Sequence, residues 1–360
     1  MNPGTPQTPA PKAVVPVAPA LIPGQLVGAG RYTLLWMLAA GGSCVIWLAR
    51  DERLGSTVAL KFLQQQLAQD PHMQQELRKE AVQNHRLTHQ NIVQLYDIFE
   101  SQHEPPFLVM EYVEGASLHT MRMDRVNDVF SWTDLKPVVL QLCSALDHAH
   151  SEQLIHRDLK PANIMIDTKG RVKLADLGIS AALNDGYTEL LGLRDNRGTM
   201  TFMSPQQMEG ESPQVSDDIY ALGATLYELL CGVPPFHTGD IQHQLQAVPP
   251  QPIEARLAEK NLPCDTPSEI TQMIMDCLNK DPTVRPASVR AVAHIVAPES
   301  AAQPLFITAP PTNVQRTAGV ATARIPRSRF SREFYIVMIA LGALLLVAGL
   351  TLYTVMEYRN

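Results

Sequence analysis

The sequence is poor in cysteine, and its cysteines are scattered. Only five occur in 360 residues, and no two of them form a C-x-x-C pair. An odd number without paired spacing excludes a disulfide framework and argues against a zinc site. The pattern is typical of reduced thiols in a cytosolic protein.

Positive charge is scarce as well. Lysine and arginine number 29 against 36 aspartate and glutamate residues, which gives a formal net charge of −7. Proteins that bind nucleic acid usually carry basic blocks, and this sequence has one short basic stretch, near its C-terminus. The composition therefore argues against nucleic acid as the main partner. The sequence also lacks internal repeats of solenoid length, so its body is not a repeat array.

The N-terminus lacks the features of a secretory signal peptide. Residues 1–30 have no basic start, and proline interrupts the apolar runs, as in "TPAPKAVVPVAPALIPG". A signal peptide needs an unbroken apolar core. We expect a disordered arm rich in proline and alanine.

One long hydrophobic run stands near the other end. Residues 334–356, "FYIVMIALGALLLVAGLTLYTVM", contain no charged residue, and they are long enough to cross a bilayer. Four arginines precede the run: Arg324, Arg327, Arg329 and Arg332. The positive-inside rule then places the preceding part of the chain in the cytoplasm. We expect a single-pass protein of the cytoplasmic membrane, with 298–333 as a flexible linker and 357–360 as a short extracytoplasmic tail.

Residues 31–297 form the predicted folded body. Its first part contains short β-branched or aromatic runs separated by turn signals, such as "RYTLLWML", "SCVIWLAR" and "TVALKFL". A helix is expected from the Asp-Pro at 70–71, and two more strands follow it. After Gly115 the apolar residues recur with helical spacing, and "DDIYALGATLYELLCG" reads as a buried helix. The fold class is therefore predicted as α+β, with a five-stranded, one-helix lobe and a larger helical lobe.

Several motifs occur in this body in a fixed order. They are "VALK", "HRDLKPAN", "DLG" and then "SPQQ", "SDDIYALG" and "DPTVRP". In this order the chain resembles the eukaryotic-like serine/threonine protein kinases, in particular the membrane-bound bacterial type. The resemblance covers 31–297 and implies a bilobal kinase fold that uses ATP and Mg²⁺ to phosphorylate protein substrates.

The resemblance implies a role for each charged residue of these motifs. Asp158 would accept the proton of the substrate hydroxyl, and Lys160 would steady the γ-phosphate. Asn163 and Asp176 would supply the hard oxygen ligands that Mg²⁺ prefers. The apolar residues around "HRDLKPAN" support this interpretation, because charges in an apolar frame need partners.

The nucleotide would lie between the two lobes. Lys61 would hold the α- and β-phosphates and pair with a glutamate of the following helix, either Glu80, the better match, or Glu76. The adenine would lie against the backbone from Glu111 to Val113, with Met110 behind it.

The glycine-rich loop departs from the family pattern. Ala39, Gly41 and Cys44 occupy the three glycine places, and Gly42 is an additional glycine. Glycine at such places lets the backbone approach phosphates or adopt a positive φ. We therefore expect weakened nucleotide affinity rather than its loss.

Two further positions differ from the family. Gln206 stands where a glutamate usually pairs with the arginine that corresponds to Arg285, and glutamine can bond a guanidinium without charge assistance. Asn84, four residues after Glu80, stands where the family packs an apolar side chain. A buried polar residue costs stability unless it finds a partner, and it could favour a less active position of the helix.

Residues between Asp176 and Pro205 correspond to the activation loop. Thr188 is the first candidate for a phosphorylation site, followed by Tyr187, Thr199 and Thr201, although Thr199 better fits a structural role. Arg157 could pair with a phosphate on this loop.

Two functions follow from the motifs. The first is an active membrane-tethered serine/threonine kinase that autophosphorylates, with a homodimer as a possible arrangement for reaction in trans. The alternative is a pseudokinase that acts as a tethered nucleotide-binding or scaffold protein. Retention of all five polar motif residues favours the enzyme: Lys61, Glu80, Asp158, Asn163 and Asp176.

Overall fold

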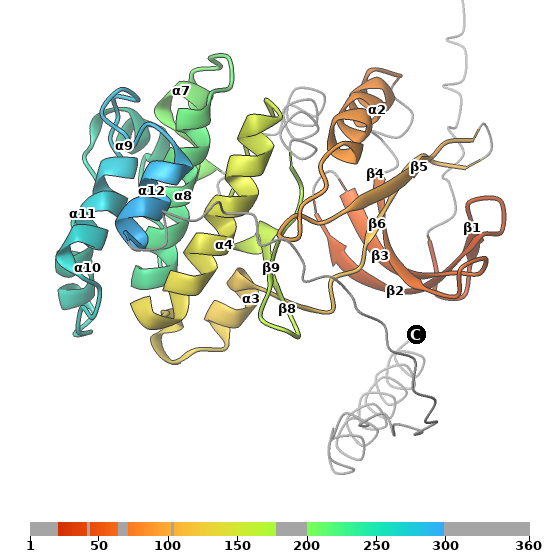
Figure 1. Ribbon diagram of the computed structural model, residues 1–360, viewed down its shortest axis with the longest axis horizontal. Helices are drawn as coiled ribbons and strands as arrows, with labels where there is room; N and C mark the ends of the chain where they lie inside the picture. The colour runs from red at the N-terminus through yellow and green to blue at the C-terminus, as the bar shows by residue number, and fades with distance from the viewer. Residues whose placement is uncertain (1–20, 42–43, 64–70, 102–103, 178–199, 299–360) are drawn as a thin grey trace, which may run out of the picture. The chain divides into compact units, whose positions relative to one another are not determined.

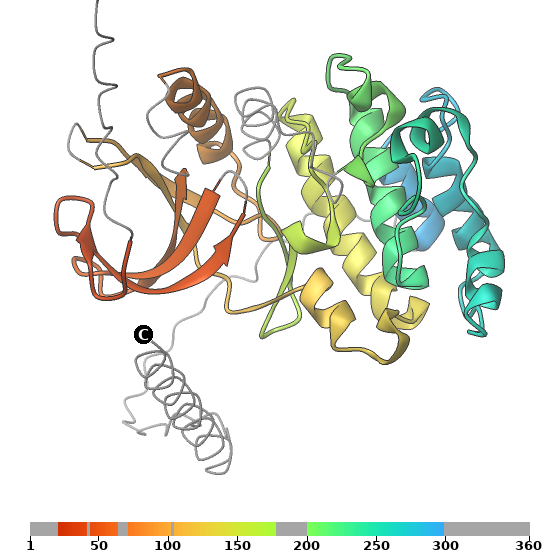
Figure 2. The same cartoon turned by 180° about the vertical axis from the view of Figure 1, so that it is seen from behind.

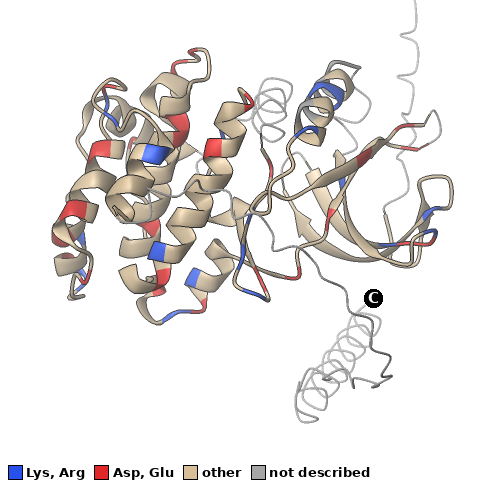
Figure 3. Cartoon of the chain, viewed as in Figure 1, with Lys and Arg blue, Asp and Glu red and all other residues tan. Residues whose placement is uncertain are grey.

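The computed structural model describes residues 21–41, 44–63, 71–101, 104–177 and 200–298. Its elements follow the predicted order, with a sheet-rich N-terminal lobe and a larger helical C-terminal lobe (Figure 1). Acidic and basic residues are interspersed over the described part of both lobes (Figure 3).

The N-terminal lobe is an antiparallel sheet in the order β1-β2-β3-β4-β6-β5. Its strands are β1 (Leu26–Val27), β2 (Tyr32–Ala40), β3 (Cys44–Asp51), β4 (Thr57–Leu63), β5 (Leu95–Phe99) and β6 (Phe107–Glu111). Buried aromatic rings fill one side of this sheet, and Phe107 contacts Tyr32, Phe62 and Phe99. The β-branched and aromatic runs thus form strands because one face of each can be buried.

The prediction of five strands is wrong by one, because β1 is a sixth strand. This two-residue strand pairs with β2 and lies within 1–30, the segment assigned to the disordered arm. The turn that follows it has positive φ at Gly28 and Gly30, and the carboxylate of Glu104 accepts the N–H of Gly28 at 2.6 Å. A strand this short has no periodicity from which it could be recognised.

Helix α2 (Pro71–His85) begins with a proline, which suits the first turn of a helix. It packs beside β5, as both views of the molecule show (Figures 1 and 2). Leu77 and Ala81 bury its inner face against Leu95 and Leu108 of the sheet. Near the end of α2, Asn84 reaches the carbonyl of Leu177, in the segment that follows β9 (Val172–Leu174).

The C-terminal lobe contains a second, three-stranded sheet in the order β7-β8-β9, which the sequence did not indicate. Its strands are β7 (Gly115–Ser117), β8 (Ile164–Asp167) and β9 (Val172–Leu174). The short helices between them are α3 (Leu118–Met123), η1 (Val126–Asp128) and η2 (Pro161–Asn163), and the long one is α4 (Trp132–Ser151). These strands have only three or four residues, too few for a clear alternating pattern.

The longest of the remaining helices is α8 (Val215–Cys231), whose residues from Asp217 to Cys231 are all buried. The others are α7 (Pro205–Met208), α9 (Ile241–Ala247), α10 (Ile253–Glu259), α11 (Ser268–Cys277) and α12 (Val289–Val296). Helix α8 ends at Gly232, which has the left-handed conformation that favours glycine (φ 73°). A helix that is apolar on every side forms the centre of a lobe, as predicted for this one.

Within the described ranges, no helix combines the length and apolar character needed to cross a membrane. The predicted span 334–356 lies outside those ranges, as do most of the linker before it and residues 1–20 of the arm.

Candidate active site

The loop between α4 and β8 carries "HRDLKPAN", and a buried carboxylate fixes its start. Asp218 of α8, which is fully buried, accepts the backbone N–H of His156 at 2.8 Å and that of Arg157 at 2.9 Å. His150 Nε2 lies 2.7 Å from the same carboxylate. A buried charge is tolerated only when hydrogen bonds satisfy it, so these contacts hold the loop against the central helix.

The sequence prediction gave no role to Asp218. The signal was present, because "SDDIYALG" places two acidic residues at the start of an otherwise apolar helix. A carboxylate in that frame must find partners within the protein.

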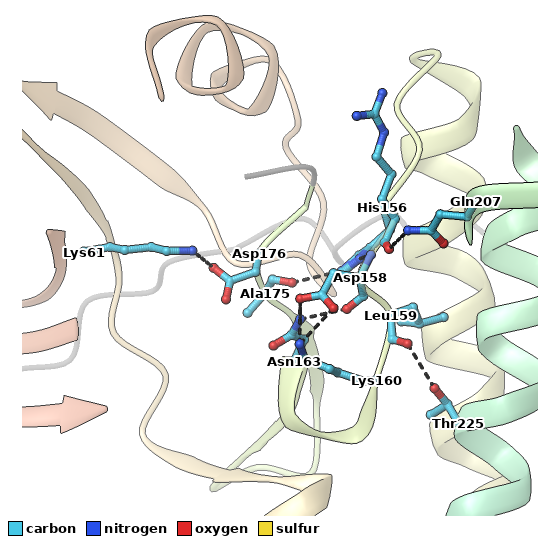
Figure 4. A network of polar contacts seen from close by, with 11 residues as sticks. Lys61, His156, Asp158, Leu159, Lys160, Asn163, Ala175, Asp176, Gln207 and Thr225 are labelled. Carbon is cyan, nitrogen blue, oxygen red and sulfur yellow. Dashed lines mark hydrogen bonds and ion pairs between the residues drawn. The ribbon is translucent and has the colours of Figure 1, made fainter. Parts of the chain in front are cut away.

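The backbone at Arg157 is strained. Its φ of 66° lies in the left-handed region, which is rare for residues other than glycine. Its carbonyl oxygen accepts the side-chain amide of Gln207 at 2.8 Å, and Thr225 Oγ1 donates to the carbonyl of Leu159 at 3.4 Å (Figure 4). Residues of α7 and α8 therefore hold the loop on either side of Asp158.

Asp158, Lys160 and Asn163 meet at the centre of this loop (Figure 4). The Nζ atom of Lys160 lies 2.8 Å from both carboxylate oxygens of Asp158. The amide of Asn163 donates to the carbonyl of Asp158 at 2.8 Å and to its carboxylate at 3.1 Å. These contacts fix the direction of the Asp158 carboxylate, and the residue is only 5% exposed.

His156 connects this loop to the segment that carries Asp176. Its Nδ1 accepts the N–H of Asp158 at 3.2 Å, so its Nε2 is the donor to the carbonyl of Ala175 at 3.0 Å. The N–H of Ala175 in turn donates to the carbonyl of Asn163 at 2.9 Å. The two predicted metal ligands, Asn163 and Asp176, are thus joined through the backbone of one residue.

Asp176 faces the N-terminal lobe and pairs with Lys61. The Nζ atom of Lys61, on β4, lies 2.5 Å from the Asp176 carboxylate (Figure 4). Burial alone would raise the pKa of Asp176, but the charge of Lys61 and its hydrogen bond outweigh burial and lower that pKa. Asp176 therefore stays ionised at neutral pH, as a metal ligand must.

Glu80 and Glu76, the predicted partners of Lys61, both lie on α2. Their side chains are outside the described part of the structure, so the pairing stays a prediction.

The predicted adenine segment lies at the end of β6. Glu111 is the last residue of that strand, and its side chain pairs with Lys173 of β9 at 2.8 Å. Lys173 is 8% exposed and Val113 is 6% exposed. The pair, which the sequence prediction missed, connects this segment to the C-terminal lobe.

The glycine-rich loop begins at the end of β2. Ala39 pairs with Ile46, and the N–H of Gly41 donates to the carbonyl of Cys44 at 2.9 Å. Gly41 has no positive φ, and a Cβ placed on it would approach only the Cys44 carbonyl, at 3.8 Å. The positive-φ reason for glycine is therefore wrong at Gly41, and the close approach of a ligand is the reason that remains. Gly42 lies outside the described residues.

Comparison with known proteins identifies the family to which this site belongs. Residues 32–296 match the protein kinase domain. The chain belongs to the protein kinase family.

Curated relatives of this chain are named serine/threonine-protein kinases. It is 39% identical over 227 residues to a probable serine/threonine-protein kinase PknB of Bifidobacterium longum, covering 61% of this chain and 32% of the relative. It is 37% identical to PknB of Mycobacterium tuberculosis, covering 71% of this chain and 40% of that relative. It is 35% identical to PknB of Mycolicibacterium smegmatis, covering 83% of this chain and 49% of that relative. The predicted membership of the protein kinase family is confirmed, and the names of these relatives agree with the predicted serine/threonine type. The chain spans less than half the length of these relatives.

The fold is also that of solved kinase domains. The PknI kinase domain of Mycobacterium tuberculosis superposes with a TM-score of 0.60 at 25% identity, covering 77% of this chain and 98% of that domain. The predicted bilobal fold is thus confirmed for the kinase body.

The kinase family uses ATP and Mg²⁺, and the residues at this site fit that use. Asp176 offers an ionised carboxylate, and Asn163 offers an amide oxygen while its nitrogen bonds Asp158. Across the described residues, no three His, Cys, Asp or Glu side chains form a metal-binding group. Mg²⁺ needs no such cage, because it is usually bound by one or two carboxylates together with substrate phosphates and water.

The segment after the activation loop is held by polar contacts of Ser204 and Gln206. Ser204 Oγ donates to Asp217 at 2.6 Å and caps α7. Gln206 accepts a hydrogen bond from Arg285 at 2.7 Å, as predicted, and it also donates to the carbonyl of Lys280 at 2.9 Å. The second bond was not predicted, and a carboxylate could not make it.

The predicted phosphorylation sites are only partly described. Thr188, Tyr187 and Thr199 lie outside the described residues, whereas Thr201 lies inside them and is 8% exposed. In this conformation the side chain of Thr201 is therefore poorly accessible to another kinase molecule.

Asn84 has found a partner. Its amide nitrogen donates to the carbonyl of Leu177 at 2.7 Å. Part of the cost expected for a polar side chain at this position is thereby offset.

Proposed function

We propose that this chain is an active, ATP-dependent kinase that phosphorylates serine and threonine hydroxyls of proteins. The observation that carries the proposal is the convergence of Lys61, Asp158, Lys160, Asn163 and Asp176 at the boundary between the lobes. Phosphoryl transfer depends on positioning and charge neutralisation, and these residues offer both.

Each of these side chains has its own role in the proposed reaction. Asp158 orients the substrate hydroxyl and accepts its proton while the oxygen bonds the γ-phosphorus and the bond to the β-phosphate oxygen breaks, releasing ADP. Lys160 neutralises charge on the transferred phosphoryl group, and Lys61 binds the remaining phosphates. Magnesium held by Asn163 and Asp176 would supply further positive charge to the phosphates.

We also propose that 334–356 anchors the kinase in the cytoplasmic membrane, with its catalytic body in the cytoplasm. The support is the charge-free run and the arginines before it. Attachment raises the local concentration of the kinase and would favour autophosphorylation between two copies. Membrane fractionation of the full chain beside a variant lacking 334–356 tests this: the anchor is refuted if both remain with the soluble protein.

Intact-mass analysis of the full chain in detergent, incubated with Mg·ATP, tests the activity. The control is Asp158→Asn, which keeps the shape of the side chain and removes the base. Mass gains in single-phosphate steps that the control lacks would support the enzyme, and mapping them would test Thr188. No gain in either protein, with nucleotide still bound, would instead favour the scaffold function.

A further inference from the structure

Gln207 of α7 donates to the backbone of the loop that carries Asp158. Its side-chain amide lies 2.8 Å from the carbonyl oxygen of Arg157 (Figure 4). That carbonyl belongs to the peptide group that joins Arg157 to Asp158. The N–H of the same peptide group donates to Nδ1 of His156 at 3.2 Å. The peptide group directly before the Cα of Asp158 is therefore held at both of its polar atoms.

This peptide group needs support because it follows a strained residue. Arg157 has a φ of 66°, a conformation that costs energy for residues other than glycine. Such a conformation persists only where the surrounding structure holds it. Asp218 binds the N–H of Arg157 at 2.9 Å, and Gln207 binds its carbonyl at 2.8 Å. Among the described residues, Gln207 is the only group that bonds this carbonyl.

The position of Gln207 is itself fixed by α8. Its backbone N–H donates to Ser204 Oγ at 3.0 Å, and that hydroxyl, which is fully buried, donates to Asp217 at 2.6 Å. The next residue of α8, Asp218, binds the catalytic loop directly. A side chain directs its partner well when other contacts lock its own position. Two adjacent carboxylates of one buried helix thus support Arg157 from both sides.

We propose that Gln207 is a positioning residue for Asp158, acting through the peptide group between Arg157 and Asp158. The inference rests on the proposed function, because the direction of Asp158 matters to a reaction in which it accepts the proton of a substrate hydroxyl. When the carbonyl of Arg157 loses its donor, the peptide group is free to rotate, and rotation displaces Asp158 from that hydroxyl. Lys61 and Asp176 lie on other segments of the chain, so nucleotide binding does not depend on this bond.

The variants differ in whether they can donate to the carbonyl of Arg157. Gln207→Met keeps the length of the side chain and removes the donor, and Gln207→Glu does so with a polar group. Gln207→His restores a donor, because the Nε2 of histidine lies as many bonds from Cα as the Nε2 of glutamine. All variants are made in the full chain.

Gln206→Met is the matched control. Gln206 is the neighbouring glutamine of the same helix, and its amide also donates to a backbone carbonyl, that of Lys280 at 2.9 Å. It accepts a second bond from Arg285, so its replacement removes two bonds. Neither bond involves the catalytic loop. The control therefore loses at least as much stability as Gln207→Met without touching the backbone of Asp158.

Kinetics and nucleotide binding are measured below the lowest Tm of the set. In Gln207→Met and Gln207→Glu we expect kcat to fall by about tenfold, the size of one lost hydrogen bond, and the Kd for ATP to change by less than about twofold. Gln207→His should recover most of the kcat. Gln206→Met should lower Tm and keep kcat within about threefold of wild type.

Hydrogen exchange at the Asp158 amide requires no turnover. This N–H is the other polar atom of the peptide group, so rotation of the group removes its bond to His156 and opens it to exchange. We expect exchange about tenfold faster in Gln207→Met than in wild type, and no change in Gln206→Met.

The outcomes separate this inference from the proposed function. The positioning role is refuted if Gln207→Met keeps either the kcat or the exchange rate of wild type, or if Gln206→Met loses kcat equally. If wild type binds nucleotide but transfers no phosphate, the kinase activity fails. Faster exchange at Asp158 in Gln207→Met would then still support the hold on the peptide group, and unchanged exchange would refute it.

Discussion

Replacing Asp218 by asparagine should separate catalysis from nucleotide binding. The carboxylate of Asp218 is fully buried and accepts the N–H groups of His156 and Arg157, with His150 as its third contact. Asparagine has the same shape, but one of its two terminal groups is a donor. At least one backbone N–H of the catalytic loop would then face another donor.

The size of the effect follows from these contacts. A hydrogen bond to a charged group contributes about 1.5–3 kcal/mol, and a buried donor left unsatisfied costs about 1–3 kcal/mol. We expect Asp218→Asn to lower the free energy of unfolding by about 3 kcal/mol, which for a domain of this size lowers Tm by about 6–12 °C. A small displacement of a catalytic group can cost about 100-fold in rate, so kcat should fall by about that factor.

Nucleotide binding should respond much less. Lys61 and the adenine segment do not contact Asp218, so the Kd for ATP should change by less than about threefold, under 1 kcal/mol. Thermal melting measures Tm. Initial rates at saturating ATP measure kcat, and titration calorimetry measures the Kd for ATP, both at a temperature below the lowered Tm.

The adjacent Asp217 provides a matched control. It is also buried, but its carboxylate bonds Ser204 and the N–H of Gln214 instead of the catalytic loop. Asp217→Asn should therefore lose comparable stability and keep kcat within about tenfold of wild type. The reasoning is refuted if Asp218→Asn keeps its kcat, or if the two variants lose kcat equally.

Three further predictions concern other contacts. Burial and the neighbouring His148 lower the pKa of His89, so the contribution of this residue to stability is present above pH 6.5 and lost as pH falls. On acidification, Tm should therefore fall more steeply in wild type than in His89→Gln, and equal slopes would contradict this. Lys173→Met removes the ion-pair partner of Glu111, so the KM for ATP should rise by about tenfold, some 1–2 kcal/mol, with kcat unchanged. The control Arg171→Met, which breaks an exposed ion pair with Asp167, should leave KM unaltered. Gln206→Ala removes bonds to Arg285 and Lys280 and should lower the free energy of unfolding by about 2 kcal/mol in denaturant titrations; a loss below about 0.5 kcal/mol would show that the amide contributes little.

The strands and long helices could be predicted because each has a local signal. Alternating or β-branched runs marked β2, β3 and β4, and the apolar stretch after Asp218 marked α8 as a buried helix. The motif order located Asp158, Asn163 and Asp176, and the structure brings them together.

What the sequence did not indicate depends on contacts between distant segments. Asp218 lies more than 60 residues beyond the loop that it holds, and Lys173 lies 62 residues beyond Glu111. No local pattern reports which carboxylate meets which backbone N–H after folding. The strand β1 was missed for a different reason, since two residues are too few to show a period.

The two substituted positions, 84 and 206, share one feature that sequence comparison alone would not show. In both, an amide stands where the family pattern expects a side chain without an N–H donor, and in both the amide donates to a backbone carbonyl: Leu177 for Asn84 and Lys280 for Gln206. An apolar residue or a carboxylate could not make either bond. The residues expected there would contribute apolar packing at 84 and charge at 206, whereas each amide fixes the direction of a backbone carbonyl. These departures therefore exchange one kind of stabilisation for another, and a loss of activity does not follow from them.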